Sequence, residues 1–293
     1  MVDDPPLQAS ARAFVALQYL LPQHFLSGLV HGVTRLRAPW IKNTLIRSFV
    51  GRFHPDMSEA AQTDPLGFPT FNEFFTRALR PGARSSDPDP RALVSPVDGT
   101  VSQLGLLDGS WLVQAKGLAY SLEALLGNAA EWAARLRGGA FATLYLAPYN
   151  YHRIHMPLTG ELRAAWYLPG ELFSVNAASA ALVPGLFARN ERVVCAFEDQ
   201  ALDFALVLVG ALFVGSMATV WHGDVTPRTP RRRLELPLAG CAAPLRLPKG
   251  AEMGRFNMGS TVILLLPAGR STWLSGLGAG STVRVGEPLA YLT

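Results

Sequence analysis

The chain has 293 residues, of which 49% are hydrophobic and only 16% are charged, and its formal net charge is +4. The hydrophobic content excludes a disordered chain, and the small basic excess does not by itself indicate a nucleic-acid partner. The 22 prolines and 27 glycines exclude a long helical bundle or a coiled coil.

Three short amphipathic helices are predicted in the first sixty residues. The first is expected to be capped by Ser10 and ended by Pro22, and the second to be ended by Pro39. Six basic residues and no Asp or Glu occur between Pro5 and Pro55. Apolar stripes with basic polar faces are typical of helices that lie in a membrane interface. An ordinary helical subdomain has the same periodicity, so both interpretations remain open at this point.

From residue 93 onward the sequence pattern changes to short Val- and Leu-rich runs separated by Gly, Pro and Asp. This pattern predicts a mostly β core. A short helix is expected at 71–79, capped by Thr70 with Glu73, and a helical insertion at 121–137. The uncharged run 204–221 reaches the lower length limit of a membrane span, but its valines and glycines favour two buried strands. The predicted fold class is α+β, with a β-rich core and an N-terminal group of amphipathic helices.

The two cysteines, Cys195 and Cys241, belong to no Cys/His cluster, so we expect free thiols rather than a zinc site or a disulfide framework. The acidic start, MVDDPP, is unlike a secretory signal or an Arg-rich presequence.

Three stretches carry residues with possible chemistry. Asp98 lies in SPVDGTV, where a turn carboxylate is the ordinary interpretation. His152 and His155 lie in YHRIHMPL and fit a general base, half of a metal site or buried structural histidines. Ser260 follows Gly259 directly before an apolar run, an arrangement that is also common in simple turns.

A more specific chemistry is open to the Gly259–Ser260 pair. The serine hydroxyl can attack the preceding carbonyl, because glycine has no side chain to block the approach, and this attack converts the peptide bond into an ester. Elimination of the ester breaks the chain and leaves a dehydroalanine. Loss of ammonia then gives a pyruvoyl group, a built-in carbonyl that acts as an electron sink.

With these stretches in view, the sequence resembles phosphatidylserine decarboxylase of the bacterial and mitochondrial type. The resemblance covers roughly residues 65–290 and is dense and ordered. The matching phrases are TFNEFFTRALRPGAR (70–84), SPVDGTVSQLG (95–105), YHRIHMPLTGEL (151–162), PGELFSVN (169–176), LFARNERVV (186–194), LVGALFVGSMATVW (208–221) and KGAEMGRFNMGSTVI (249–263).

The resemblance implies an Asp98–His155–Ser260 relay for self-cleavage, in which His155 takes the Ser260 proton and Asp98 orients the imidazole. His152 matches a histidine that assists substrate binding or protonation. Met258 replaces the leucine of the family's Leu-Gly-Ser-Thr phrase, a change that preserves volume and apolarity. Cleavage would give a β chain of residues 1–259 and an α chain of residues 260–293, whose pyruvoyl carbonyl would condense with the substrate amine. No metal is expected.

The implied substrate is phosphatidylserine, converted to phosphatidylethanolamine at an anionic membrane surface, with no nucleic acid involved. We expect a peripheral protein on the cytoplasmic side of the inner membrane, built as a heterodimer of its own fragments or a dimer of these.

The predicted domains are a membrane-associating region, 1–62, and a catalytic domain, 63–293. The segments near 95–101 and 281–292 also resemble the paired halves of barrel-sandwich domains. The alternatives are a pyruvoyl decarboxylase of a soluble amino acid and a non-enzymatic membrane-binding barrel protein.

Overall fold

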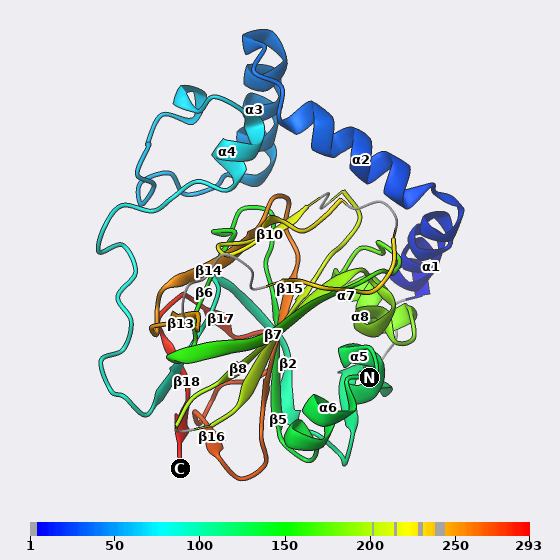
Figure 1. The fold of residues 1–293 in the computed structure, drawn as a ribbon. Coiled ribbons are helices and arrows are strands. Elements are labelled where there is room, and N and C mark those ends of the chain that lie inside the picture. Colours follow the sequence, from blue (N-terminus) through cyan, green and yellow to red (C-terminus); the bar gives the residue numbers. More distant parts are fainter. Residues whose placement is uncertain (1–4, 201, 214–215, 228–230, 238–243) are drawn as a thin grey trace.

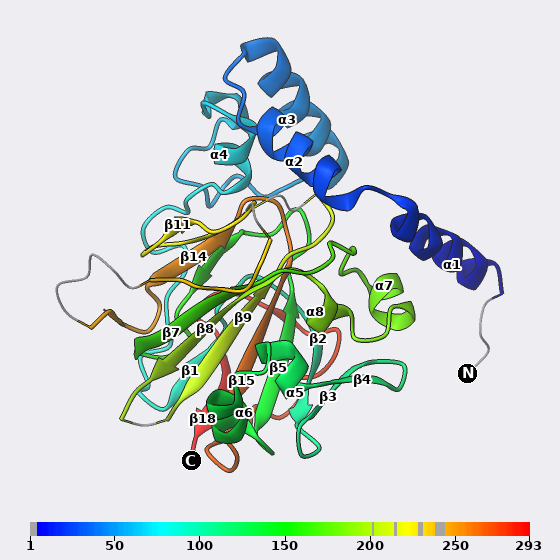
Figure 2. The ribbon, with the colours of Figure 1, turned by 45° about the vertical axis from the view of Figure 1, so that its right-hand side comes forward.

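The computed structural model describes residues 5–200, 202–213, 216–227, 231–237 and 244–293. Helices α1 (Pro5–Leu20), α2 (Gln23–Thr34) and α3 (Pro39–Phe53) lie outside the sheets, along one end and one side of the molecule (Figures 1 and 2). Ser10 lies inside α1, so its prediction as a cap was wrong. Pro39 opens α3 instead of ending α2, because proline at the first helical position needs no hydrogen bond for its missing N–H.

No single helix in the described residues is long and apolar enough to cross a membrane, whereas Ala9–Leu20 and Gln23–Thr34 together reach that length and composition across a bend of 86°. The run 204–221 contains two buried strands, β9 (Phe204–Val209) and β10 (Met217–Thr219), as predicted.

The centre of the molecule is an antiparallel sheet of nine strands in the described part of the chain, which confirms the α+β class (Figure 1). In spatial order its path runs through β12 (Leu234–Glu235), β7 (Gly160–Leu168), β8 (Arg192–Glu198), β9, β15 (Thr261–Leu266), β5 (Ala140–Tyr145), β2 (Gly99–Leu106) and β17 (Thr282–Val283), with β13 (Arg246–Leu247) also on β7.

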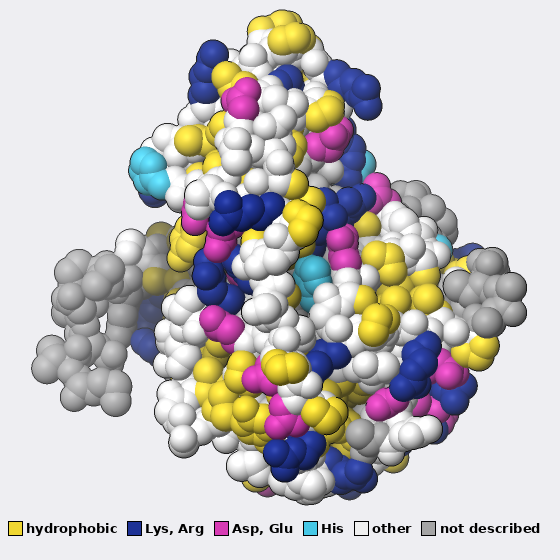
Figure 3. Space-filling view, turned by 90° about the vertical axis from the view of Figure 1, so that its left-hand side faces the viewer, with side chains coloured by type: hydrophobic (Ala, Val, Ile, Leu, Met, Phe, Trp, Pro, Cys, Tyr) yellow, Lys and Arg dark blue, Asp and Glu magenta, His cyan; other side chains and the backbone are white. Residues whose placement is uncertain are grey.

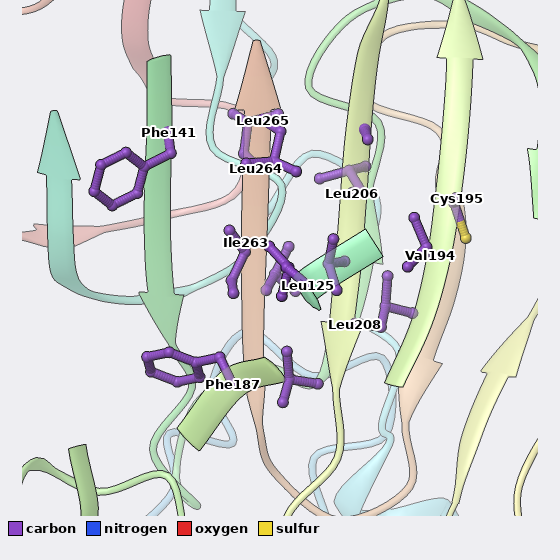
Figure 4. Close-up of a cluster of buried hydrophobic side chains, with 14 of the residues drawn as sticks. Leu125, Phe141, Phe187, Val194, Cys195, Leu206, Leu208, Ile263, Leu264 and Leu265 are labelled. Atoms are coloured by element: carbon purple, nitrogen blue, oxygen red, sulfur yellow. The ribbon is translucent and has the colours of Figure 1, made fainter. Parts of the chain in front are cut away.

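Strand β15 is central and every residue in it is buried, because β5 and β9 pair with its two edges and side chains cover both of its faces. A continuous apolar run such as TVILLL suits that position. Figure 4 shows Ile263, Leu264 and Leu265 among side chains from β5, β8 and β9, with Leu125 and Phe187 contributed by helices. The helices of this core are α5 (Leu122–Leu126), α6 (Ala130–Leu136), α7 (Ala177–Leu182) and α8 (Leu186–Arg189).

Cys195 lies in the same cluster, where it is a buried free thiol as predicted (Figure 4). Burial raises the pKa of this thiol and keeps it neutral. Cys241 lies outside the described residues, and its state remains a prediction.

Smaller sheets surround the core. One contains β11 (Gly223–Asp224), β10, β14 (Glu252–Phe256) and β6 (Arg153–His155) in that order. Another contains β1 (Ala92–Val94), β18 (Pro288–Leu292) and β16 (Ser271–Trp273), and β3 (Trp111–Ala115) with β4 (Leu118–Ser121) forms a hairpin. Because β1 pairs with β18 and β2 with β17, the segments near 95–101 and 281–292 lie together, as their sequences suggested.

Helix α4 (Phe71–Phe75) follows the short 3₁₀ turn η1 (Pro65–Gly67). Thr70 caps it by accepting the Glu73 amide at 3.1 Å, as predicted. Its phenylalanines form an aromatic cluster with α3, made of Ile46, Phe49, Phe71, Phe74 and Phe75. This cluster joins residues on both sides of position 62, and the domain division at 62/63 remains a prediction.

Candidate active site

The Gly259–Ser260 pair lies between β14 and β15, at the point where the chain enters the centre of the large sheet. The Leu146 amide donates to the Ser260 carbonyl at 2.8 Å, so the sheet ladder holds this position. The Ser260 side chain is buried, and its Oγ has no hydrogen-bond partner among the described residues. A buried hydroxyl without a partner is uncommon, because it loses its hydration without compensation.

His152 lies directly before β6, against Gly259 on one side and the Phe75 ring on the other, at 4.1 Å between ring centroids. A Cβ atom on Gly259 would lie 3.2 Å from His152 Nε2, so glycine allows this close approach. Nδ1 contacts the Asn150 carbonyl oxygen at 2.8 Å. That oxygen can only accept, so Nδ1 carries the proton of the neutral ring and Nε2 presents a lone pair.

The environment of His152 holds its ring neutral. Burial, and next the charge of Arg77, lower its pKa to about 3. Nε2 has no hydrogen-bond partner among the described residues. The result is a neutral proton acceptor beside the Gly259–Ser260 pair.

His155, on β6, has both ring nitrogens engaged. Nδ1 donates to the Gly250 carbonyl at 2.7 Å, and the Tyr151 hydroxyl donates to Nε2 at 3.0 Å. Burial is the main reason that the pKa of His155 is lowered. This histidine is therefore also neutral, but its lone pair is covered by Tyr151.

Asp98 is held by groups other than His155. Arg84 donates to its carboxylate from Nε at 3.0 Å and from Nη2 at 2.5 Å, and the Val285 amide donates at 2.8 Å. Arg84 also pairs with Glu59 at 2.9 Å. Figure 3, viewed from the side where the chain runs from α4 to β1, shows acidic and basic side chains interspersed near the junction of the helical and sheet regions.

The structure thus brings together some of the predicted residues and not others. His152, Gly259 and Ser260 lie together, whereas no hydrogen bond joins Asp98 to His155 in the described part of the chain. Asp98 is still near enough for its charge to raise the pKa of His155, which opposes the effect of burial. Asp98 and His155 are therefore near each other without a direct hydrogen bond, and no hydrogen bond among the described residues joins His155 to Ser260.

Three residues at the site were given no role from the sequence: Arg77, Arg84 and Tyr151. Arg77 is buried, donates to the Tyr149 carbonyl at 3.1 Å, and has no partner for Nε and Nη1 among the described residues. All three lie inside the phrases that carried the family resemblance, but an arginine or tyrosine in such a phrase does not reveal which carboxylate or imidazole it will meet.

A largely apolar cavity of about 300 Å³ leads to this place. It is lined by residues of α3, of α4, of the end of β5, of the loops at 174–176 and 211–213, and by Met258, Gly259 and Ser260. An apolar cavity with a few polar groups in its lining is the usual form of a small-molecule site. Within the described residues, no group of three His, Cys, Asp or Glu side chains could hold a metal ion.

Fold and site together define an enzyme-like pocket for an apolar substrate, and comparisons with known proteins identify the family. The sequence model of the family described as phosphatidylserine decarboxylase matches residues 71–291, and a second model, described as PSD, matches residues 13–54. The chain is 48% identical over 278 residues to the phosphatidylserine decarboxylase proenzyme of Methylococcus capsulatus, covering 95% of this chain and 96% of that protein. The proteins of the same name from Bordetella pertussis and Pseudomonas aeruginosa are 52% identical (94% and 93% covered) and 51% identical (95% and 96% covered).

The chain therefore belongs to the phosphatidylserine decarboxylase family. This confirms the resemblance found in the sequence, and with it the assignment of the chain as an enzyme of that family.

Proposed function

We propose that this protein decarboxylates phosphatidylserine to phosphatidylethanolamine, using a pyruvoyl group that it makes from Ser260 by cleaving itself between Gly259 and Ser260. One observation carries the proposal: the apolar cavity is lined by Gly259 and Ser260, and the buried Ser260 hydroxyl has no hydrogen-bond partner among the described residues. His152, whose Nε2 also has no partner there, lies against Gly259. The relatives are named proenzymes, which agrees with a processed chain.

The residues present fit the formation of this group. Ser260 Oγ is free to attack the Gly259 carbonyl carbon, and the attack needs a neutral base to take the hydroxyl proton. Gly259 allows His152 to approach closely, and burial keeps the imidazoles of His152 and His155 unprotonated. Once formed, the pyruvoyl group supplies a carbonyl that accepts the electrons released with carbon dioxide.

We assign the proton relay of self-cleavage to Asp98 and His155, and the later binding or protonation step to His152. In the structure, Tyr151 donates to Nε2 of His155, so this nitrogen can act as a base only after Tyr151 releases it. His152 already faces Gly259 and so remains beside the new N-terminus after cleavage. The assignment is therefore tested by separate substitution of the two histidines, as described in the Discussion.

The pairing of strands supports a heterodimer of the two fragments. All four strands of residues 260–293 pair with other strands, and three of them pair with residues before 260: β15 with β5 and β9, β17 with β2, and β18 with β1. Cutting one peptide bond before β15 leaves these ladders in place. We therefore expect the fragments to stay associated through the shared core, either as one heterodimer or as a dimer of heterodimers.

We further propose peripheral binding to an anionic membrane on the cytoplasmic side of the inner membrane. Large apolar side chains are exposed along the N-terminal helices, among them Phe14, Leu17, Leu20, Phe25, Leu29 and Trp40. Exposed apolar side chains together with basic residues and no acids suit insertion into a lipid interface. A lipid substrate also explains why one of these helices, α3, lines the cavity through Phe49 and Phe53.

The test is the mass of the purified chain and its activity on phosphatidylserine. The wild type should give a fragment of 34 residues and release carbon dioxide from phosphatidylserine, whereas Ser260→Ala should stay intact and inactive. Ser271→Ala is the matched control, because it also removes a hydroxyl that has no hydrogen-bond partner in the described part of the chain, and it should cleave normally. A split Ser260→Ala chain would overturn the mechanism. An intact wild type would favour the non-enzymatic alternative, and activity on free serine alone would favour a soluble substrate.

A further inference from the structure

The polarity of α1 and α2 is opposite to that of a helix on a water-soluble protein. The most buried side chains of α2 are Gln23, Ser27 and Thr34, and in α1 the buried side chains include Gln18. Leu20 and Phe25, at the bend between the helices, are 82% and 71% exposed. Helices of soluble proteins bury their apolar face, so the buried polar side chains here need a specific explanation.

Each of three buried polar groups accepts a hydrogen bond from the backbone of a distant loop. Gln18 Oε1 accepts the Ser174 amide at 2.7 Å, and Gln23 Oε1 accepts the Leu172 amide at 2.6 Å. On the next turn of α2, Ser27 Oγ accepts the Phe213 amide at 3.2 Å. The two glutamines are also joined, since Gln23 Nε2 donates to the Gln18 carbonyl at 2.8 Å.

These loops are walls of the cavity that ends at Ser260. Residues 174–176 and 211–213 both line it, together with Phe49 and Phe53 of α3. Side-chain hydrogen bonds to loop amides fix the position of a loop that has no sheet neighbours of its own at that point. The helices that face the proposed membrane therefore hold two walls of the substrate cavity directly.

We propose that Gln18, Gln23 and Ser27 are positioning residues that couple membrane docking of α1 and α2 to the shape of the substrate cavity. Insertion of the exposed apolar face into lipid restrains α1 and α2. Because the three hydrogen bonds tie the loops at 172–176 and 211–213 to these helices, the loops are restrained as well. The ligand is a diacyl phospholipid that enters from the bilayer. This inference rests on the proposed function.

Activity on phosphatidylserine in vesicles provides the first test. The double variant Gln18→Met, Gln23→Met keeps side-chain length but removes the acceptors. It should cleave itself and sediment with vesicles as the wild type does, but lose about tenfold or more in kcat/KM, the scale expected for the loss of hydrogen bonds that hold a site.

Thr34→Val is the matched control, because Thr34 is a buried polar residue of α2 and, among the described residues, its hydroxyl bonds only within the helix, to the His31 carbonyl. It should keep full activity. An equal loss in Thr34→Val, or an unchanged kcat/KM in the double methionine variant, would show that the glutamines have no positioning role. If the double variant does not cleave itself, Ser27→Ala takes its place with the same expectations.

Hydrogen exchange of the wild-type protein provides a second test that does not depend on activity. Vesicles of phosphatidylglycerol and phosphatidylcholine should slow exchange of the amides of Leu172, Ser174 and Phe213, because docking holds their acceptors in place. The double methionine variant should lose this protection at Leu172 and Ser174 and keep it at Phe213. Bound vesicles with no change in these amides would refute the coupling, whereas an uncleaved or inactive wild type would refute the proposed function instead.

Discussion

His152 and His155 have the same tautomer for the same reason, since each donates from Nδ1 to a backbone carbonyl. They differ in what faces Nε2. Phe75 and Gly259 surround His152 without offering it a hydrogen bond, while Tyr151 donates to His155. Because burial makes both rings neutral, either can act as a base once its lone pair is accessible.

Separate variants assign the two roles. His155→Ala and Asp98→Asn should block maturation, leaving less than about one hundredth of the wild-type cleavage rate, the usual contribution of a general base. His152→Ala should mature but decarboxylate poorly. Electrophoresis under denaturing conditions measures cleavage, and carbon dioxide release measures turnover. Normal cleavage in His155→Ala combined with an intact His152→Ala chain would transfer the role of base to His152.

At the scale of elements, helices α1 to α3 combine exposed apolar side chains with exposed basic ones. The structure also shows which of these are not available to lipid. Leu45 packs against the α3–α4 aromatic cluster, and Arg35 lies 3.6 Å from Asp224. A test of membrane binding must therefore use other residues.

Vesicle co-sedimentation should separate the two contributions to binding. Arg37→Gln, Arg47→Gln, Arg52→Gln should weaken binding to anionic vesicles by about 3 kcal/mol in total at low salt, at about 1 kcal/mol per basic residue near the surface. Leu17→Ser, Leu20→Ser, Leu29→Ser should weaken binding to neutral and anionic vesicles alike, because apolar burial does not depend on lipid charge. Both variants should still cleave themselves. Full sedimentation of the leucine variant would place the anchor elsewhere.

At the scale of the whole molecule, the cleavage point coincides with the start of a strand that is buried along its whole length. Strand β15 pairs along its length with β5 and β9, so the sheet stays complete when the bond before it is cut. The same burial that secures the fragment also places two neutral histidines inside the fold, and this has a consequence for stability at low pH.

Stability should fall with acidity because of His152. Its pKa is about 6.5 when unfolded and about 3 when folded, so below pH 6.5 the unfolded chain binds a proton that the folded chain does not. The resulting loss is about 1 kcal/mol per pH unit, or about 2 kcal/mol from pH 7 to pH 5. Urea unfolding of the Ser260→Ala chain should show this loss, and adding His152→Asn should reduce it. The exposed His54→Asn change should leave it unaltered; an equal reduction there would contradict the attribution.

The sequence by itself determined the elements whose character is local. The continuous apolar run at 261–266 required a strand covered on both faces, and Thr70 with Glu73 was enough to fix a helix start. The Gly259–Ser260 pair before that strand identified the candidate cleavage site, because its chemistry depends on two adjacent residues. The family followed from ordered phrases spread along the chain.

Only the tertiary structure decided which groups meet at the site. Asp98 accepts hydrogen bonds from Arg84 and Val285, which are 14 and 187 residues away in the sequence. His155 donates to Gly250, which is 95 residues away. Hydrogen-bond partners so distant in sequence are set by sheet order and loop paths, which no local pattern encodes. For the same reason, the sequence gives no role to Gln18, Gln23 and Ser27 in the N-terminal helices. The folded chain shows that each accepts a hydrogen bond from a loop amide.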